Sequence, residues 1–172
     1  SVQTLNYNAN VTTDYTSDAQ IFTGLGVNST TGSCDVIFGA NVSHVPAYIF
    51  GCADTADNAN GITSVTIGGS VTEIGEYAFY NCSKLEVVNM GESVAKINDS
   101  AFSGCTNLVK LNISDLEAWC KVDIVSMFSH PFAGAITKVS GVDNFENVDT
   151  EIYLNNELIS TLEIPASVTE IK

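Results

Sequence analysis

One phrase of this sequence occurs twice, 23 residues apart. The stretch "SVTEIGEYAFYNCSKL" at residues 70–85 returns as "SVAKINDSAFSGCTNL" at residues 93–108, with apolar residues at matching positions. A repeat of this length indicates a solenoid, because one short unit cannot bury its own apolar face and must stack on a neighbour. The repeat therefore limits the possible folds more than any single motif does.

The apolar residues keep a fixed register between the copies. Alternation at Val65 and Ile67 predicts a short strand with one buried face, and Ala78 and Phe79 are expected in a short turn or one-turn helix. Stacked copies then share a continuous core. The positions that match at an offset of 23 are Ile62, Val65, Ile67, Val71, Ile74, Ala78, Phe79 and Cys82 with Leu85, Val88, Met90, Val94, Ile97, Ala101, Phe102 and Cys105. The expected core markers are Phe50, Phe79, Phe102, Cys82 and Cys105.

The same pattern divides the rest of the chain. Upstream, Val36 and Phe38 match the second copy at an offset of 29, and the polar loop at residues 52–61 takes up the extra length. A third copy opens at Leu108 and breaks, and the pattern restarts at Ile159. We therefore expect one domain, composed of a cap-like segment at 1–32, repeats at 33–113, an irregular insert at 114–157 and a truncated repeat at 158–172.

The insert carries two local signals. Ser114 with Glu117 three residues later is a plausible capping box that opens a short helix. "IYLNNELI" alternates on both sides of Asn155-Asn156, which predicts a hairpin that restarts the sheet. Four residues are expected to pack beneath the insert as local core: Trp119, Phe128, Pro131 and Phe132.

The charge balance excludes two classes of partner. The chain has 6 basic and 20 acidic residues, for a net charge of −14, which repels phosphate backbones and anionic lipids. No apolar run approaches the roughly 18 residues that span a bilayer. We therefore expect neither nucleic-acid binding nor membrane insertion.

The five cysteines are odd in number and contain no C-x-x-C pair, so neither a disulfide framework nor a zinc site is indicated. Cys82 and Cys105 occupy equivalent places in successive copies. Stacked about 4.8 Å apart, their Cα atoms would just permit a bridge. The simpler interpretation is a ladder of small buried residues.

Signals for catalysis or metal binding are weak. Of the two histidines, His44 falls at a variable surface position of the repeat, and a Cys120/His130 pair lacks a third, orienting group. The loops 54–61 and 141–151 gather oxygen ligands suited to calcium without the spacing of a calcium-binding loop. No phosphate-binding or hydrolase motif occurs. We expect no enzyme, no cofactor and no metal, and a calcium-dependent lectin-like or enzymatic domain is a lesser alternative.

The central repeats resemble a known family. "ITSVTIGGSVTEIGEYAFYNC" and "LEVVNMGESVAKINDSAFSGC" are similar to the BspA-like, or treponemal-type, leucine-rich repeat. The resemblance covers residues 33–172. The chain departs from the family pattern where Val45-Pro46 replaces Ile-Gly, where Asn98 replaces Gly, and where the third copy breaks after Ile113.

The resemblance implies both a fold and a function. The fold is of the α/β class: a right-handed leucine-rich-repeat solenoid with short parallel strands on one face and turns or short helices on the other. The function is non-catalytic adhesion of a secreted or cell-surface protein of an anaerobic bacterium to macromolecules on host or neighbouring cells.

The expected working surface is the set of strand positions that alternate with the core, because repeat proteins bind partners along such extended faces. These positions are Asp35, Ile37, Ser64, Thr66, Val87, Asn89, Lys110, Asn112, Thr161 and Glu163. A protein or a glycan is the expected ligand. The alternative is a spacer that presents another domain, since Ile171-Lys172 stops where the earlier copy continues and we expect the polypeptide to extend further.

Overall fold

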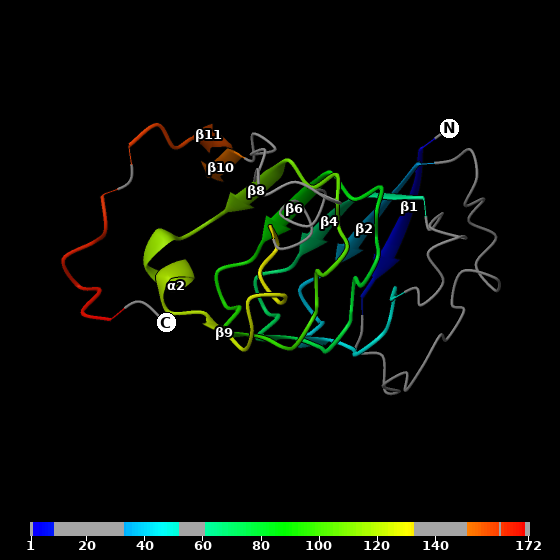
Figure 1. The fold of residues 1–172 in the computed structure, drawn as a ribbon, viewed down its shortest axis with the longest axis horizontal. Helices are drawn as coiled ribbons and strands as arrows, with labels where there is room; N and C mark the ends of the chain where they lie inside the picture. Colours follow the sequence, from blue (N-terminus) through cyan, green and yellow to red (C-terminus); the bar gives the residue numbers. More distant parts are fainter. Residues whose placement is uncertain (1, 9–32, 52–60, 133–150, 162, 171–172) are drawn as a thin grey trace, which may run out of the picture.

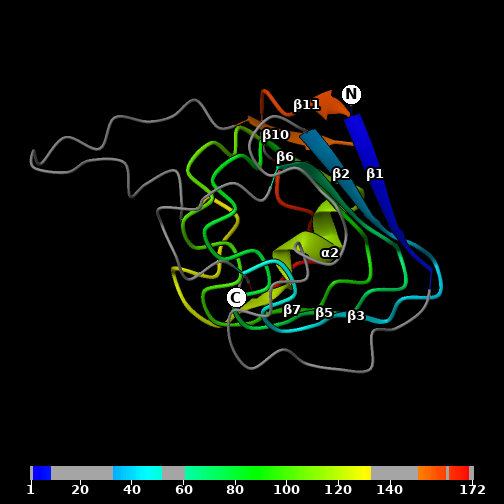
Figure 2. The same cartoon turned by 90° about the vertical axis from the view of Figure 1, so that its right-hand side faces the viewer.

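The chain forms a stack of coils with three sides (Figures 1 and 2). This computed structural model describes residues 2–8, 33–51, 61–132, 151–161 and 163–170. A seven-stranded sheet forms one side of the stack and a four-stranded sheet forms a second. Turns such as residues 77–85 form the third. Figure 2, which looks along the stack, shows the two sheets on different sides of a common interior.

The seven-stranded sheet is parallel except at its last pair, β10–β11. Its strands, in spatial order, are β1 (Val2–Tyr7), β2 (Ser33–Phe38), β4 (Ile62–Ile67), β6 (Val87–Met90), β8 (Lys110–Ile113), β10 (Glu151–Leu154) and β11 (Glu157–Leu158). Val36 pairs with Val65, Val65 with Val88, and Val88 with Leu111. These are the offsets of 29, 23 and 23 predicted from the sequence, so the predicted repeat is the structural coil.

The four-stranded sheet consists of two-residue strands. They are β3 (His44–Val45), β5 (Glu73–Ile74), β7 (Lys96–Ile97) and β9 (Asp123–Ile124), all parallel. This second sheet was not predicted, because two residues are too short to show an alternating pattern. Strand β1 was also not predicted; it lies in the segment expected only to cap the repeats.

The core is one continuous column. Phe50 and Phe79 stack with ring centroids 5.7 Å apart, and Phe79 and Phe102 stack at 5.0 Å with their planes 13° apart. All three rings are buried. Each coil therefore covers the apolar face of the next, as the repeat requires.

The two cysteines of the core are free thiols rather than a bridge. Cys82 donates from Sγ to the carbonyl oxygen of Phe50 at 3.6 Å, and Cys105 donates to that of Phe79 at 3.2 Å. Both side chains are fully buried. Each thiol thus ties the turn of its own coil to the coil before it.

Close approach between two coils explains the glycine at position 75. A Cβ on Gly75 would collide with the backbone of Ala47 in the neighbouring coil. In the next coil Asn98 stands at this position, and its Nδ2 donates to the carbonyl oxygen of Ile74 at 2.9 Å and to Glu73 Oε1 at 2.6 Å. The departure at Asn98 therefore adds hydrogen bonds between coils.

The short helix predicted in the insert is present, but its predicted cap was wrong. Helix α2 (Leu116–Cys120) is capped by Asp115, whose Oδ1 accepts from Ala118 N at 2.8 Å. The prediction of Ser114 as the cap was wrong by one residue, because the Ser114 hydroxyl donates to the Met90 carbonyl at 3.3 Å.

The hairpin was predicted correctly, and one member of the local core was not. Asn155 and Asn156 adopt φ values of 51° and 68° in the turn between β10 and β11. Pro131 is buried, and Trp119 and Phe132 pack partly buried against the core. Phe128 is 47% exposed, so its assignment to the local core was wrong.

Replacing Phe79 with alanine is expected to reduce the free energy of unfolding by about 3–5 kcal/mol, because the substitution leaves a cavity between two stacked rings. Urea denaturation followed by circular dichroism measures this change. The matched control is Phe128→Ala, which removes a half-exposed ring and is expected to change stability by no more than about 0.5 kcal/mol. Equal denaturation midpoints for the two variants would contradict the shared column.

Candidate binding surface

The outer face of the seven-stranded sheet carries two rows of side chains in register, which we call the stripe. Eight of the ten predicted residues lie in it. The first row is Thr4, Asp35, Ser64, Val87, Lys110 and Glu151. The second row is Asn6, Ile37, Thr66, Asn89, Asn112 and Tyr153. Their chain neighbours in the central strands, such as Val65 and Val88, point into the core.

The placement predicted for Thr161 and Glu163 was wrong. Both residues are exposed and lie outside both sheets. Strand β10 takes the expected place beside β8, with Glu151 opposite Lys110 and Tyr153 opposite Asn112. The chain then reverses at the hairpin, and among the described residues the apolar pattern that restarts at residue 159 joins no parallel strand.

Two members of the stripe were missed at its other end. Thr4 and Asn6 stand opposite Asp35 and Ile37 because β1 pairs in parallel with β2. The inward-facing residues of β1 include Tyr7, whose ring stacks on Phe38 with centroids 5.1 Å apart. The alternation in "TLNY" was the signal that could have identified this strand.

A ladder of hydrogen bonds crosses the second row. Asn89 donates from Nδ2 to Thr66 Oγ1 at 3.2 Å, and Asn112 donates from Nδ2 to Asn89 Oδ1 at 3.3 Å. The backbone N–H of Asn156 completes the ladder by donating to Asn112 Oδ1 at 2.8 Å. An amide has two N–H donors, so Asn89 and Asn112 each keep one N–H without a partner in the described part of the chain.

The charged members of the stripe lie toward its ends. Ser64 donates to Asp35 Oδ1 at 2.5 Å. At the other end Lys110 Nζ lies 3.9 Å from the centre of the Tyr153 ring. The Tyr153 hydroxyl donates to Glu151, and this bond raises the pKa of Tyr153 above its ordinary value. The middle of the stripe therefore presents uncharged polar and small apolar groups.

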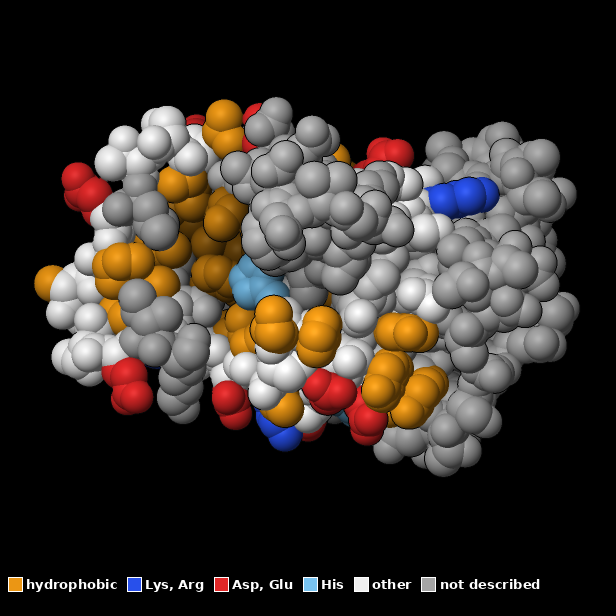
Figure 3. Space-filling view, viewed as in Figure 1, with side chains coloured by type: hydrophobic (Ala, Val, Ile, Leu, Met, Phe, Trp, Pro, Cys, Tyr) orange, Lys and Arg blue, Asp and Glu red, His pale blue; other side chains and the backbone are white. Residues whose placement is uncertain are grey.

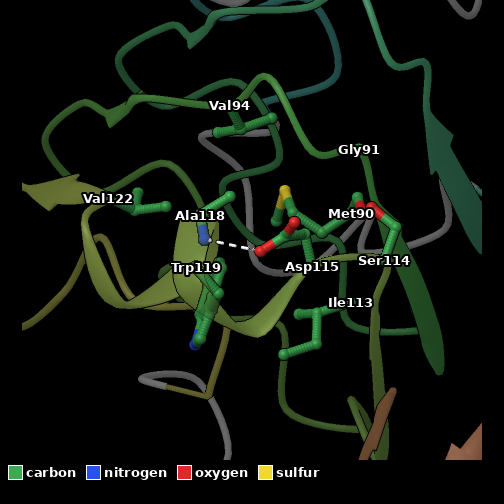
Figure 4. Close-up of a pocket in the computed structure, with 9 residues that line it drawn as sticks. All are labelled: Met90, Gly91, Val94, Ile113, Ser114, Asp115, Ala118, Trp119 and Val122. Carbon is green, nitrogen blue, oxygen red and sulfur yellow. Dashed lines mark hydrogen bonds between the residues drawn. The ribbon is translucent and has the colours of Figure 1, made fainter. Parts of the chain in front are cut away.

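A small pocket lies where helix α2 closes the end of the stack (Figure 4). It has an empty volume of about 180 Å³, part of it open to solvent. The carboxylate in its lining, that of Asp115, already caps the helix. The pocket is therefore a packing junction between the last coil and the helix. Its lining is Met90, Gly91, Val94, Ile113, Ser114, Asp115, Ala118, Trp119 and Val122.

The cysteine and histidine side chains considered for catalysis lie in environments typical of structural residues. Burial raises the pKa of the Cys105 thiol well above its ordinary value, which disfavours the reactive thiolate. No hydrogen bond joins Cys120 to His130 within the described residues. His130 lies beside Trp119 and Phe132, with ring centroids 6.0 and 5.2 Å away.

Among the described residues, no three His, Cys, Asp or Glu side chains gather closely enough to share a metal ion. The calcium hypothesis rested on the loops 54–61 and 141–151, which lie outside the described residues except for Gly61 and Glu151.

The family model of the BspA type leucine rich repeat region matches residues 53–172, in 6 copies. The chain belongs to the BspA-type leucine-rich repeat family. Membership identifies it as a repeat module of the kind that generally serves interactions with other proteins. Neither the curated proteins nor the solved structures gave a significant match. In the part of this BspA-type domain that the structure describes, no helix is long and apolar enough to cross a membrane.

The stability of the domain is expected to fall in acid partly through His130. Burial lowers the pKa of this imidazole below 6.5, its value in the unfolded chain. The neutral ring also accepts a hydrogen bond at Nδ1 from Phe132 N, 3.1 Å away. The stabilising contribution is therefore complete above about pH 6.5 and is lost as the pH falls through the lowered pKa of the folded state.

The His130→Asn variant keeps an acceptor at this place but does not titrate. Between about pH 7.5 and about pH 5 its unfolding free energy is expected to decline less steeply than that of the wild type. Thermal and urea denaturation at each pH measure the difference between the two slopes. Parallel slopes would show that His130 carries no pH dependence.

Proposed function

We propose that this domain is a non-catalytic adhesion module of a secreted or cell-surface protein, and that it binds a protein partner through the stripe. The observation that carries the proposal is the ladder along Thr66, Asn89 and Asn112, which holds a row of side chains in fixed orientation over parallel strands. Groups that are already oriented lose less conformational entropy on binding than mobile ones.

The composition of the stripe favours a protein over a glycan. Ile37 and Val87 place small apolar groups among neutral hydrogen-bonding side chains, and this mixture suits the apolar patches and peptide groups of a protein surface. Sugar-binding sites commonly rely on an accessible aromatic face. The aromatic ring of the stripe, Tyr153, has Lys110 over it.

A non-catalytic role is supported by the environment of the reactive groups. The thiols of Cys82 and Cys105 are fully buried and hydrogen-bonded to backbone carbonyls. Such thiols pack as small apolar residues. The family assignment supports an extracellular location.

The test is a triple substitution of Thr66, Asn89 and Asn112 by alanine. Each lost hydrogen bond contributes about 0.5–1.5 kcal/mol, so affinity for a protein ligand is expected to fall at least about tenfold. A panel of purified extracellular proteins and a glycan array are screened with the wild-type domain, and each ligand found is then titrated with both proteins.

The matched control changes three side chains outside the stripe to alanine: Glu73 and Lys96 in the four-stranded sheet, and Thr72 immediately before β5. Both variants are first compared with the wild type by thermal denaturation, and binding is interpreted only for folded protein. If the stripe variant and the control variant retain every protein ligand equally, the assignment of the stripe is wrong. If ligands were found only on the glycan array, the proposed protein partner would be wrong and the ligand class would be a glycan.

A second candidate is a spacer that presents another domain of a larger protein. The same ladder favours it, because side chains that bond to one another across coils also stiffen the stack. In that case the triple alanine variant loses stability and loses no ligand. Denaturation and binding measured on the same preparations distinguish the two functions.

A further inference from the structure

Three tyrosines gather where successive coils leave the four-stranded sheet, and we call Tyr48, Tyr77 and Tyr80 the tyrosine corner. The backbone N–H of Tyr48 donates to the carbonyl oxygen of Glu76 at 2.9 Å. The backbone N–H of Tyr77 donates to the carbonyl oxygen of Asp99 at 3.0 Å. Tyr48 and Tyr77 therefore occupy equivalent places in adjacent coils. Their rings stack with centroids 5.0 Å apart, and Tyr80 meets Tyr77 edge-on at 5.2 Å.

The backbone at this corner is of a kind that large side chains rarely adopt. Tyr48 and Tyr77 have φ values of 56° and 52°, in the left-handed region that glycine and asparagine enter more readily. Ser100 stands at the same place in the next coil with a φ of 54°. The backbone turn at this place therefore does not require an aromatic side chain. Residues held in unfavourable backbone conformations concentrate at functional sites.

The rings lie beside carboxylates. Glu76 and Asp99 precede Tyr77 and Ser100 directly, and Tyr48 has a raised pKa because of burial and then because of these acidic neighbours. Asp99 accepts a hydrogen bond from the Ser100 hydroxyl at 3.1 Å. Within the described residues, neither carboxylate forms a salt bridge.

The tyrosine side chains are accessible for a ligand. All three are partly exposed, and their hydroxyls have no hydrogen-bond partner among the residues that the structure describes. On the face shown in Figure 3, hydrophobic and acidic side chains lie next to one another along the edge where the four-stranded sheet runs. An aromatic surface bordered by carboxylates is complementary to a cation.

We propose that the tyrosine corner binds an arginine-bearing, basic segment of a protein partner. A guanidinium group stacks on a tyrosine ring and its N–H groups donate to the carboxylates of Glu76 and Asp99. A neutral sugar would stack on the rings but would gain little from the charges. The corner follows the four-stranded sheet and shares no residue with the stripe, so this proposal stands independently of the proposed function.

The test uses the purified domain and isothermal titration calorimetry in about 0.15 M salt, which screens the general attraction of an acidic protein for cations. The probes are a capped peptide of alternating arginine and glycine, the matching lysine–glycine peptide and a neutral glucose hexasaccharide. The decisive variant is Tyr77→Asn, because asparagine tolerates the left-handed backbone and the substitution leaves every charge in place.

The arginine peptide is expected to bind more tightly than the lysine peptide, and Tyr77→Asn is expected to weaken its binding about fivefold. The matched control, Phe128→Asn, removes an exposed ring elsewhere and is expected to leave the affinity unchanged. Glu76→Gln is expected to weaken binding and to reduce its dependence on salt concentration.

Three outcomes would overturn the proposal. Equal affinity of the wild type and Tyr77→Asn for the arginine peptide would reduce the interaction to general charge attraction. If neither peptide bound measurably, the tyrosine corner would not be a site for basic segments. Binding of the hexasaccharide alone, lost in Tyr77→Asn, would assign the corner to a glycan.

Discussion

The parallel register between neighbouring coils is the constraint on which the rest of this structure depends. No coil can cover its own apolar face, so each relies on the next, and Phe50, Phe79 and Phe102 stack in one column as a result. In the four central coils, which contribute β2 and β3, β4 and β5, β6 and β7, and β8 and β9, strand pairing on two sides of that column fixes the rotation of each coil. Outward residues then recur at the same place in each coil. The stripe and the tyrosine corner are therefore consequences of the way the core is shielded.

The parts of the fold that the repeat encodes were predictable from the sequence. The spacing of apolar residues identified the coil, the buried thiols Cys82 and Cys105, and the pairing of Thr66 with Asn89. Thr161 and Glu163 were misplaced for a physical reason. An apolar alternation identifies a segment able to form a strand, whereas the partner it finds depends on which sheet position is already occupied, here by β10.

Contacts between coils and backbone conformation account for two further features that the sequence did not reveal. The choice of Asp115 over Ser114 as the helix cap depends on where the Ser114 hydroxyl finds an acceptor in another coil. Likewise, nothing in the pattern of apolar residues indicates that Tyr48 and Tyr77 take positive φ values. Propensity argues against them there. The arrangement of the tyrosine corner is therefore known only from the folded chain, although its three tyrosines lie within the repeats.

The antiparallel strand β11 also bears on how the molecule behaves in concentrated solution. A stack of parallel strands presents an edge on which a second molecule can add, and continued addition would produce fibres. Here the last strand is only two residues long, runs in the opposite direction and carries the exposed carboxylate of Glu157. Short, charged edges of this kind resist edge-to-edge growth. The turn at Asn155 and Asn156 thereby ends the parallel order of this sheet in a strand too short to template a long ladder.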